Sequence, residues 1–475
     1  MSLDADSCYR ALTSRDGRFD GLFFVAVTTT GIYCRPICPA RTPRRDRVRF
    51  FKLAAEAEKE GFRACFRCRP ELAPGHASVD AVSRTARAAL ARIEAGALND
   101  GGVPELARDL AMSERQLRRS LQRELGVSPG ELAQTRRLLV AKQLLAETAL
   151  PITEIAFAAG FQSLRRFNAA FLERFATSPS SARRGAAVGG DSITVRLGFR
   201  APFAWRELLR FTGTHAMPGA EEVDGEVYRR TVRIGDRTGW IAVGPPDAHR
   251  GTLPIEISAS LTRVLVPLLA RIRALFDLDA EPARVEAHLG GDPTLAPRIA
   301  AHPGLRVPGG FDGFELAARA ILGQQISVRG ATTLAGRIVA AIGEPIVTPF
   351  PSLSRTSPDA ASFARAGEET LARLGVMPAR ARSLVALARA VTDGLCLAPG
   401  ADPDEARARL LAIPGVGPWT AEVVLMRAIR SPDAFPHADL GILRALGGAV
   451  PKAALAAAEA WRPWRSYAAQ LLWEG

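Results

Sequence analysis

The sequence predicts a multidomain chain that is mostly α-helical with α+β parts. Its 475 residues exceed what one hydrophobic core supports, so about three or four domains are expected. Two closely spaced cysteine pairs mark a small amino-terminal domain, and helical periodicity follows from Val79 to about Phe175. A strand-like alternation begins at Ile193, and amphipathic helices run from about Leu261 to the end.

The positive charge is concentrated in the front of the chain. Residues 1–190 hold 30 Lys and Arg against 20 Asp and Glu, which is +10 of the total net charge of +13. This balance favours a polyanion such as nucleic acid as partner, although a solubilising surface would give it too. The start has no signal-peptide pattern, and no apolar run reaches the roughly 18 residues that span a bilayer, so a cytoplasmic location is expected.

Four cysteines are spaced as two metal-binding pairs: Cys34, Cys38, Cys65 and Cys68. Each pair can occupy one edge of a tetrahedron around a single Zn²⁺, and clustered cysteines in the cytoplasm bind metal more often than they form disulfides. The basic segment that follows the first pair carries Arg41, Arg44, Arg45, Arg47 and Arg49. Zinc-bound thiolate is also a nucleophile, so the site is either structural or reactive. Cys8 and Cys396, outside the cluster, are expected to be small buried hydrophobes.

The sequence around these pairs resembles the amino-terminal domain of the Ada family of bacterial adaptive-response proteins. The matching strings are Gly31-Ile-Tyr-Cys-Arg-Pro-Ile-Cys-Pro and Gly61-Phe-Arg-Ala-Cys-Phe-Arg-Cys-Arg-Pro. In that family the domain irreversibly takes a methyl group from a DNA methylphosphotriester, and the acceptor is the cysteine after Gly-Ile-aromatic. The resemblance implies that Cys34 is this acceptor; an inert zinc fold is the alternative.

Methylation of Cys34 would change the charge of such a site. Zinc with four thiolates carries −2, and conversion of one thiolate to a thioether leaves −1. Two unit charges about 4 Å apart interact by about 1 kcal/mol in water and about 4 kcal/mol at an effective dielectric of 20. The resemblance therefore implies a self-methylating transcriptional activator, with promoter DNA and RNA polymerase as partners, and we expect a monomer.

The segment 103–126 reads as a helix-turn-helix. Its leucines recur on one face, and Ser113 is a plausible N-cap of the second helix. Arginine and glutamine suit guanine and adenine edges in the major groove. The outer face of that helix carries Arg115, Gln116, Arg118 and Arg119.

A second copy of this pattern occupies residues 152–171. Gly160 falls at the turn and Phe161 in the core, and the outward positions are Gln162, Ser163, Arg165 and Arg166. The doubled pattern resembles the carboxy-terminal domain of AraC-type regulators, in which two helix-turn-helices read successive grooves. The alternative is two amphipathic helix pairs with solvated charges.

Composition and periodicity divide the chain into five segments. Small and turn-forming residues mark a linker before the strand-like part, whose strands include Val227-Tyr-Arg-Arg-Thr-Val-Arg-Ile and Gly239-Trp-Ile-Ala-Val. The expected ranges are a zinc-binding domain 1–76, a double helix-turn-helix domain 77–178, a linker 179–192, an α+β subdomain 193–302 and a helical domain 303–475.

The last segment contains a helix–hairpin–helix, Leu410-Leu-Ala-Ile-Pro-Gly-Val-Gly-Pro-Trp-Thr-Ala-Glu-Val-Val-Leu. Gly415, Val416 and Gly417 form the hairpin, whose backbone amides can approach a DNA phosphate beside the positive end of the next helix. Alone, this pattern indicates sequence-neutral DNA binding. Asp439 follows 22 residues after Gly417, a spacing typical of helix–hairpin–helix DNA glycosylases.

Residues 193–475 resemble the 3-methyladenine DNA glycosylase II family. The supporting strings include Arg319-Ala-Ile-Leu-Gly-Gln-Gln-Ile-Ser-Val and Trp464-Arg-Ser-Tyr-Ala-Ala. The resemblance implies that Asp439 is the carboxylate facing the developing sugar cation, and that an aromatic pocket holds the extruded cationic base. Trp419 and Trp473 match the family's pocket tryptophans, and Phe211 and Trp205 are weaker candidates. Core packing is the alternative for each aromatic residue.

Three positions bear on the type of reaction and its range. Trp419 stands where bifunctional relatives carry a Schiff-base lysine, so hydrolysis without lyase activity is expected. Gln325 replaces the leucine wedge that fills the gap left by the flipped base, and it is expected to intercalate. Val423 replaces a pocket tyrosine, which leaves the range of accepted bases open. An alkali ion at the hairpin is consistent with the family, although no side-chain ligand set indicates one.

Three functions fit these features. The first is DNA alkylation repair and its regulation, in which a glycosylase releasing bases such as 3-methyladenine is fused to a self-methylating regulator. The second is a transcription regulator with a non-catalytic glycosylase-like DNA clamp, and the third is a glycosylase whose front only tethers it to DNA. No Pro-Cys-His-Arg string of an alkylguanine transferase is present. Asp439 and the two tryptophans favour the first over the second, and the Cys34 context favours it over the third.

Overall fold

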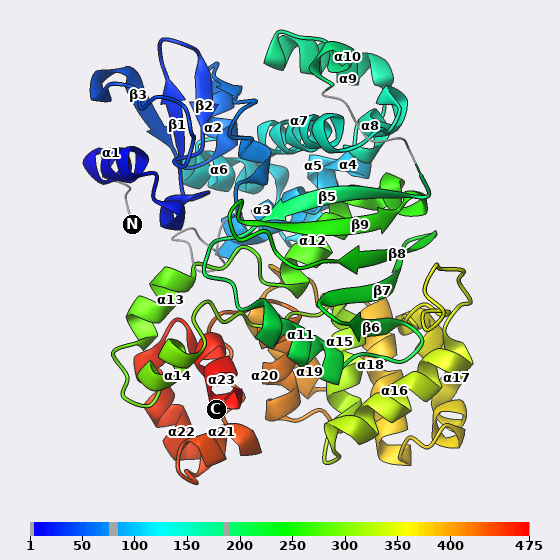
Figure 1. The fold of residues 1–475 in the computed structure, drawn as a ribbon. Helices are drawn as coiled ribbons and strands as arrows, with labels where there is room; N and C mark the ends of the chain where they lie inside the picture. Colours follow the sequence, from blue (N-terminus) through cyan, green and yellow to red (C-terminus); the bar gives the residue numbers. More distant parts are fainter. Residues whose placement is uncertain (1–3, 76–83, 184–189, 475) are drawn as a thin grey trace. The chain divides into compact units, whose positions relative to one another are not determined.

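The computed structural model describes residues 4–75, 84–183 and 190–474. The chain forms two compact units, one of residues 1–201 with 246–270 and one of residues 202–245 with 271–475 (Figure 1). The expected multidomain, largely helical architecture with sheets is confirmed. None of the described helices is long and apolar enough to cross a membrane.

A small four-stranded sheet opens the first unit, with strand order β3-β1-β2-β4. Strand β1 pairs antiparallel with β2 and β3, and β2 pairs parallel with β4. The parallel register sets Tyr33 beside Ala64, so Cys34 and Cys65, the next residues along, leave the sheet side by side. The elements are α1 (Ala5–Ser14), β1 (Phe24–Val27), β2 (Ile32–Cys34), β3 (Val48–Phe51), α2 (Ala54–Lys59) and β4 (Arg63–Ala64).

The expected double helix-turn-helix forms a bundle in the same unit. Ser113, Ser128 and Ser163 cap α6, α7 and α9, and each side chain accepts a backbone N–H of the first turn. Gly160 has φ +91°, which fits the sharp turn between α8 and α9. The helices are α3 (Arg84–Glu94), α4 (Ala97–Asp100), α5 (Val103–Asp109), α6 (Glu114–Leu125), α7 (Pro129–Glu147), α8 (Ile152–Ala158), α9 (Leu164–Phe175) and α10 (Pro179–Ala182).

The interval expected as a linker is partly structured. Helix α10 occupies its start and β5 (Ser192–Gly198) begins at its end, while residues 184–189 lie outside the described residues. Strand β5 pairs antiparallel with β9 (Thr252–Ser258), and Val195 lies opposite Ile255. The strand expected at Ile193 is therefore confirmed. Helix α12 (Leu265–Leu275) begins in this unit.

The second unit begins with helix α11 (Trp205–Thr214) and an antiparallel meander. Strands β6 (Glu221–Asp224), β7 (Val227–Ile234) and β8 (Arg237–Val243) pair in sequence order, which confirms the two strands expected here. The ion pairs of buried Arg230 with Glu221 and Glu315 join this meander to α15.

Helices make up the rest of the second unit (Figure 1). The expected helix–hairpin–helix is formed by α19 and α20, which pack together. Helix α15 packs on both α18 and α20, so a buried apolar helix lies behind the hairpin. The helices are α13 (Pro282–Leu289), α14 (Ala296–Ala301), α15 (Gly313–Leu322), α16 (Val328–Ile342), α17 (Ala360–Arg373), α18 (Pro378–Thr392), α19 (Pro403–Leu411), α20 (Pro418–Arg427), α21 (Leu440–Ala445), α22 (Pro451–Ala457) and α23 (Arg465–Trp473).

Candidate functional sites

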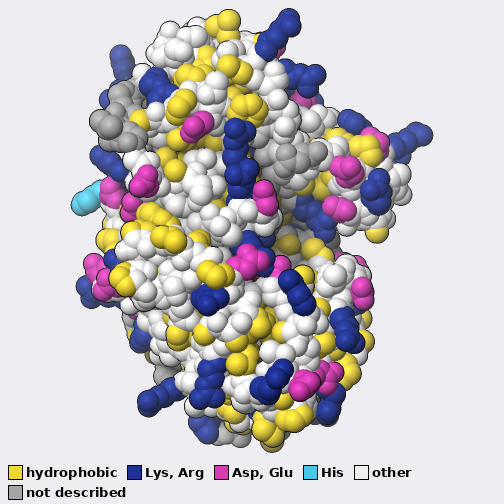
Figure 2. Space-filling view, turned by 90° about the vertical axis from the view of Figure 1, so that its right-hand side faces the viewer, with side chains coloured by type: hydrophobic (Ala, Val, Ile, Leu, Met, Phe, Trp, Pro, Cys, Tyr) yellow, Lys and Arg dark blue, Asp and Glu magenta, His cyan; other side chains and the backbone are white. Residues whose placement is uncertain are grey.

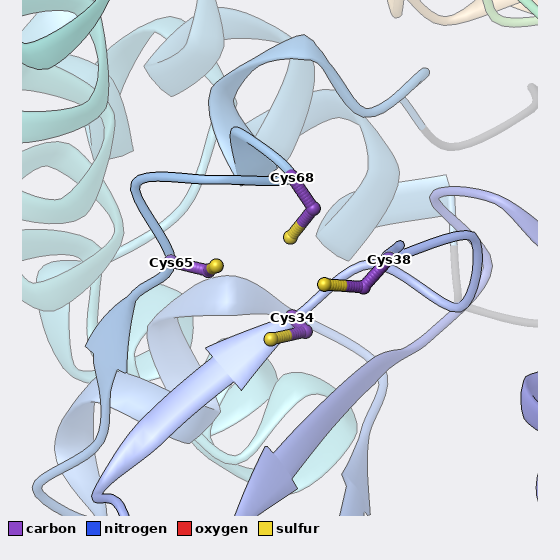
Figure 3. Close-up of side chains that lie close together, drawn as sticks. All are labelled: Cys34, Cys38, Cys65 and Cys68. Atoms are coloured by element: carbon purple, nitrogen blue, oxygen red, sulfur yellow. The ribbon is translucent and has the colours of Figure 1, made fainter. Parts of the chain in front are cut away.

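The four expected cysteines converge at the end of the small sheet. Their sulfur atoms all lie within 4.8 Å of one another and point toward a common centre (Figure 3). Tetrahedral zinc with Zn–S bonds of about 2.3 Å needs sulfur–sulfur separations of about 3.8 Å, so the set fits that metal. The cysteines come from β2, the turn after it, the end of β4 and the loop that follows: Cys34, Cys38, Cys65 and Cys68.

Backbone and side-chain contacts fix the cysteine loops. The Arg35 and Arg67 N–H groups donate to the sulfurs of Cys68 and Cys65 at 3.4 and 3.3 Å. The buried guanidinium of Arg35 pairs with buried Asp20 and donates to the Cys68 carbonyl at 3.3 Å. These contacts position the sulfurs before any metal binds.

The cluster is open to solvent on the Cys34 side. Cys34 is half-buried, whereas Cys38, Cys65 and Cys68 are buried. Cys396, expected to be buried, is also half-buried, so that expectation was wrong, whereas Cys8 lies in the core as expected. The arginines of the segment that follows the first cysteine pair are all exposed: Arg41, Arg44, Arg45, Arg47 and Arg49.

A cleft adjoins the cysteine cluster in the same unit. Its volume is about 530 Å³, and its lining combines arginines with aromatic and aliphatic residues: Ile32, Arg63, Ala64, Cys65, Phe66, Arg67, Arg69 and Phe175. Arg67 is exposed, and Arg63 donates to the Phe175 carbonyl at 3.5 Å. The cleft offers positive charge within a few residues of the sulfurs, as an anionic strand would require.

A buried carboxylate connects the strand of Cys34 to the helical bundle. The Tyr33 hydroxyl donates to Glu58 at 3.0 Å, and the Thr135 hydroxyl of α7 donates to the same carboxylate at 2.6 Å. Arg174 of α9 forms an ion pair with Glu58. Burial raises the pKa of Glu58, while Arg174 and both hydroxyls act in the opposite direction. Sequence reasoning missed this residue because a glutamate in a short polar helix gives no signal of burial.

The expected DNA-facing residues of the two helix-turn-helices are exposed. They are Arg115, Gln116, Arg118, Arg119, Gln162, Arg165 and Arg166, while Phe161 is buried as expected. The Gln116 side-chain oxygen accepts from the Ser113 backbone N–H at 2.9 Å, so this glutamine closes a capping box. Gln162 donates to the Asn99 carbonyl at 2.9 Å. In Figure 2, Lys and Arg side chains are spread over the visible face, with Asp and Glu interspersed.

The second unit holds Asp439 between two tryptophans. The Trp419 indole N–H donates to Asp439 Oδ2 at 2.8 Å, and the Trp473 indole N–H donates to Oδ1 at 2.9 Å. Oδ1 also accepts the backbone N–H groups of Gly441 and Ile442 at 2.8 and 3.1 Å, because Asp439 caps helix α21. The carboxylate is therefore fixed by four donors, of which one reaches Oδ2.

Gly441 makes room for this arrangement. A Cβ at this position would lie 3.0 Å from Asp439 Oδ1 and 3.3 Å from Cδ1 of Trp473. A larger residue would therefore push the indole away from the carboxylate. Sequence reasoning missed Gly441, although its position two residues after Asp439 was visible.

The hairpin is built for close approach by a ligand. Gly415 has φ +80°, and a Cβ there would lie 2.4 Å from the Ser383 hydroxyl. A Cβ at Gly417 would meet no protein atom within 4 Å, so its missing side chain leaves the backbone open to the outside. The Gln324 side-chain amide donates to the Gly415 carbonyl at 3.0 Å and to the Thr420 hydroxyl at 2.9 Å.

Gln325, which was expected to intercalate, follows Gln324 directly. It is exposed and has φ +55°, a left-handed conformation that is uncommon for non-glycine residues. Exposed Ile326 and Val328 follow it and supply apolar surface that Gln325 lacks. The segment 325–328 therefore presents two polar and two apolar residues at the surface.

Phe211 lies in a cationic environment that sequence reasoning missed. Its ring stacks on the His215 ring at a centroid distance of 4.2 Å, and the Arg427 guanidinium lies 4.5 Å from the Phe211 centroid. Burial, then Arg427 and Arg319, lower the pKa of His215 to about 4. Burial, then Arg319 and Arg430, lower the pKa of Arg427 to about 9. An ion pair between Arg210 and Glu474 ties Phe211's helix to the end of α23, beside Trp473.

Trp205 belongs to the core. It is 5% exposed, its ring packs against Phe276, and its indole N–H donates to the Glu226 carbonyl at 3.2 Å. The structure thus favours the packing alternative, and the pocket role considered for Trp205 is corrected. Val423 is buried on the same helix as Trp419, and Trp419, Trp473 and Phe211 are half-buried.

Four family models match the chain in succession. They are the metal-binding domain of Ada at residues 7–71, a helix-turn-helix domain at 106–185, the AlkA N-terminal domain at 194–312 and the HhH-GPD superfamily of base excision DNA repair proteins at 318–450. A Mycobacterium tuberculosis protein described as a probable bifunctional transcriptional activator/DNA repair enzyme AlkA is 43% identical, over 100% of this chain and 97% of its own length. The chain belongs to this AlkA family of bifunctional activator and repair proteins.

Other relatives match only part of the chain. DNA-3-methyladenine glycosylase 2 of Escherichia coli is 36% identical over 58% of this chain and 95% of its own length. The bifunctional transcriptional activator/DNA repair enzyme Ada of Escherichia coli is 32% identical over 41% of this chain and 52% of its own length. A 3-methyladenine DNA glycosylase structure from Archaeoglobus fulgidus covers 58% of this chain and 96% of its own at 22% identity, with a TM-score of 0.51, and shares the fold.

These matches confirm the resemblances on which the sequence analysis relied. The AlkA-family chain combines an Ada-type metal-binding domain and a helix-turn-helix with a DNA glycosylase of the HhH-GPD type. It is a DNA-binding protein of DNA repair and transcription regulation.

Proposed function

We propose that the second unit hydrolyses the N-glycosidic bond of alkylated bases such as 3-methyladenine in double-stranded DNA. The observation that carries this proposal is the Asp439 carboxylate, fixed between the indole N–H groups of Trp419 and Trp473. An N-alkylated purine is already cationic, so it departs with the electron pair of the breaking bond and needs little acid assistance. The protein must instead extrude the base and stabilise the sugar cation.

The hydrogen bonds of the Asp439 carboxylate leave one of its oxygens available to the substrate. Oδ1 accepts three hydrogen bonds and Oδ2 accepts one, so Oδ2 has capacity left for the sugar or for a water molecule. Water oxygen bonds to C1′ as the bond from C1′ to the base nitrogen breaks, and the proton of the water passes to solvent or to the carboxylate. Half-buried Trp419, Trp473 and Phe211 supply aromatic faces for the base.

The absence of a lyase step follows from the amine content of the chain. The full sequence has four lysines, and Trp419 stands where a Schiff-base lysine would be required. We therefore propose a monofunctional glycosylase that leaves an abasic site.

We propose further that Cys34 accepts a methyl group from DNA methylphosphotriesters. Its sulfur attacks the methyl carbon, the bond from methyl carbon to phosphate oxygen breaks, and the phosphodiester leaves with the electron pair. Cys34, Cys38, Cys65 and Cys68 would hold one Zn²⁺, which keeps thiolates deprotonated at neutral pH. Half-burial of Cys34 supports its choice over the buried three, and the arginine-lined cleft supports binding of the phosphate backbone beside it.

The helix-turn-helix bundle would convert this methylation into a transcriptional signal. Loss of one negative charge beside the phosphates favours DNA binding, and the exposed arginines of α6 and α9 would then contact promoter DNA. We propose that the DNA-bound monomer contacts RNA polymerase. A regulator with an inactive clamp is the less favoured function, because it gives no reason for the four-donor fixation of Asp439.

One experiment separates these activities. Purified protein is incubated with methylated plasmid, and the mixture is analysed for free bases by chromatography and for protein mass by intact mass spectrometry. The proposal expects released alkylpurines in catalytic excess over protein, and a single added methyl group of 14 Da that maps to Cys34. No free base would exclude the glycosylase, and an unchanged protein mass would exclude the methyl acceptor.

A further inference from the structure

Helix α20 places three side chains on one face at four-residue spacing: Trp419, Val423 and Arg427. Residues at i, i+4 and i+8 share a helix face, and eight residues rise by roughly 12 Å. Side chains lean toward the helix amino terminus, so the Arg427 side chain runs back toward Val423 and Trp419. Trp419 contacts Asp439, and Arg427 lies two turns further along the same face.

Arg427 is a half-buried cation with most of its donors unused. Its Nε donates to the Pro308 carbonyl at 2.9 Å, and its guanidinium lies against the Phe211 ring. Within the described residues, no carboxylate pairs with Arg427 and no acceptor reaches its two terminal nitrogens. At neutral pH it stays protonated, although burial lowers its pKa to about 9. Guanidinium N–H groups that no protein acceptor reaches remain able to donate to a ligand.

The surrounding groups add further donors, while the nearest carboxylates, Glu221 and Glu315, are paired with Arg230. Arg319 Nη2 donates to the His215 carbonyl at 2.7 Å, while Arg319 Nη1 is buried without a hydrogen-bond partner. Neutral His215 stacks on Phe211 and lies 2.8 Å from its carbonyl through Nδ1. The Arg427 end of the face that starts at Trp419 is thus rich in donors and positively charged.

This inference rests on the glycosylase function proposed above. A purine whose N9 is attached to the sugar near Asp439 directs its C6 edge to the opposite side. A 6-oxopurine presents an acceptor there, and a 6-aminopurine presents a donor. We propose that Arg427 is a specificity-determining residue that donates to the O6 of extruded 6-oxopurines, and thereby favours alkylguanine and deaminated purines over alkyladenine.

The test compares two bases in one reaction. Duplex DNA treated with dimethyl sulfate contains 7-methylguanine and 3-methyladenine, which are both cationic and differ at C6. Their initial release rates are measured together by chromatography, so protein concentration and DNA affinity cancel in the ratio. For Arg427→Met, which keeps an unbranched side chain but removes the guanidinium, the ratio of 7-methylguanine to 3-methyladenine is expected to fall about tenfold or more relative to the unsubstituted protein.

Arg430 provides a matched control, because it contacts the same loop as Arg427. Arg430 donates to the Val307 carbonyl, next to Pro308, and pairs with Asp277 away from the Trp419 face. Arg430→Met should leave the ratio unchanged, because it disturbs the loop without removing the pocket donor. A purely structural role of Arg427 would lower both rates equally and leave the ratio unchanged.

The possible results distinguish a failure of this inference from a failure of the proposed glycosylase function. No release of either base by the unsubstituted protein would contradict the glycosylase proposal itself. Release of both bases with the same ratio in folded Arg427→Met would overturn the role of Arg427 alone. If Arg427→Met does not fold, Arg427→Lys decides: it keeps the charge and loses the forked donors, so a ratio lowered about threefold supports the inference and an unchanged ratio overturns it.

Discussion

The Trp473 indole N–H and the Asp439 carboxylate are joined by a 2.9 Å hydrogen bond between α23 and the cap of α21. The contact has two consequences. It orients a carboxylate that already caps a helix, and it fixes the plane of an aromatic ring beside that carboxylate. Trp419 repeats the contact from α20. Three helices therefore determine where a charged oxygen and two aromatic faces meet.

Removal of either indole donor should weaken catalysis without removing the ring. Trp473→Phe and Trp419→Phe are each expected to lower the base-release rate about tenfold, since a hydrogen bond to a charged acceptor contributes about 1.5–3 kcal/mol. The measurement is single-turnover release of 3-methyladenine from methylated duplex DNA. Trp461→Phe is the control, because Trp461 also donates to a carboxylate, that of Asp292, at 2.7 Å in the core. An equal loss in the control would show that the effect is structural.

Replacement of Cys34 should abolish methyl uptake and leave base release intact. Cys34→Ser removes the half-buried sulfur but keeps three buried ligands for a metal. The expected result is no 14 Da increase in protein mass after incubation with methylated DNA, at an unchanged rate of alkylpurine release. Cys396→Ser, at a second half-buried cysteine outside the cluster, should take up methyl normally. Undiminished uptake by Cys34→Ser would remove Cys34 from the mechanism.

Loss of the metal should not affect the glycosylase activity. Elemental analysis is expected to give one zinc per chain, and Cys68→Ser should lower that content and reduce the melting temperature of the first unit. Base release by chelator-treated protein should persist, because Asp439 and its donors all belong to the second unit. Retention of stoichiometric zinc by a variant with both Cys65→Ser and Cys68→Ser would place the metal elsewhere.

The pH dependence of stability should reveal the neutral His215. Its pKa is about 4 in the folded protein and ordinarily about 6.5, so the unfolded chain binds the proton more readily. Stability from this group is complete above pH 6.5 and is lost as the pH falls toward 4. Between pH 7.5 and 4.5 the free energy of unfolding should decrease by about 2–3 kcal/mol more than in His215→Phe, which keeps a ring against Phe211.

Tryptophan fluorescence makes this measurement specific to one unit. All six tryptophans lie between residues 205 and 473, so their emission in a urea titration reports on the second unit. Parallel pH profiles for the two proteins would contradict the assignment of a neutral, half-buried His215.

The sequence predicted the features whose residues lie close together along the chain. The cysteine pairs, the capped helix-turn-helix segments and the glycine hairpin are local patterns, and Asp439 lies at a characteristic spacing from the hairpin. The cysteine pairs are brought together by the parallel pairing of two short strands, β2 and β4. Local propensity and local spacing decided these elements, so the structure confirmed them.

Groups that depend on distant contacts escaped sequence reasoning. Neutral His215 and the cationic Arg319 and Arg427 lie on three helices or their ends and form one cluster, yet arginine and histidine usually occupy solvated positions. Glu58 lies in a short helix of polar sequence, and its burial depends on α7 and α9. Trp205 shows the reverse error, since an aromatic residue near a site resembled a pocket residue but packs in the core.

The most direct test of the account is single-turnover release of 3-methyladenine by Asp439→Asn. Asparagine still caps α21 and keeps the size of the side chain, so folding and DNA binding should persist. The account predicts a rate at least a hundredfold lower, because the charge that stabilises the sugar cation is gone. A wild-type rate in folded, DNA-binding Asp439→Asn would contradict it.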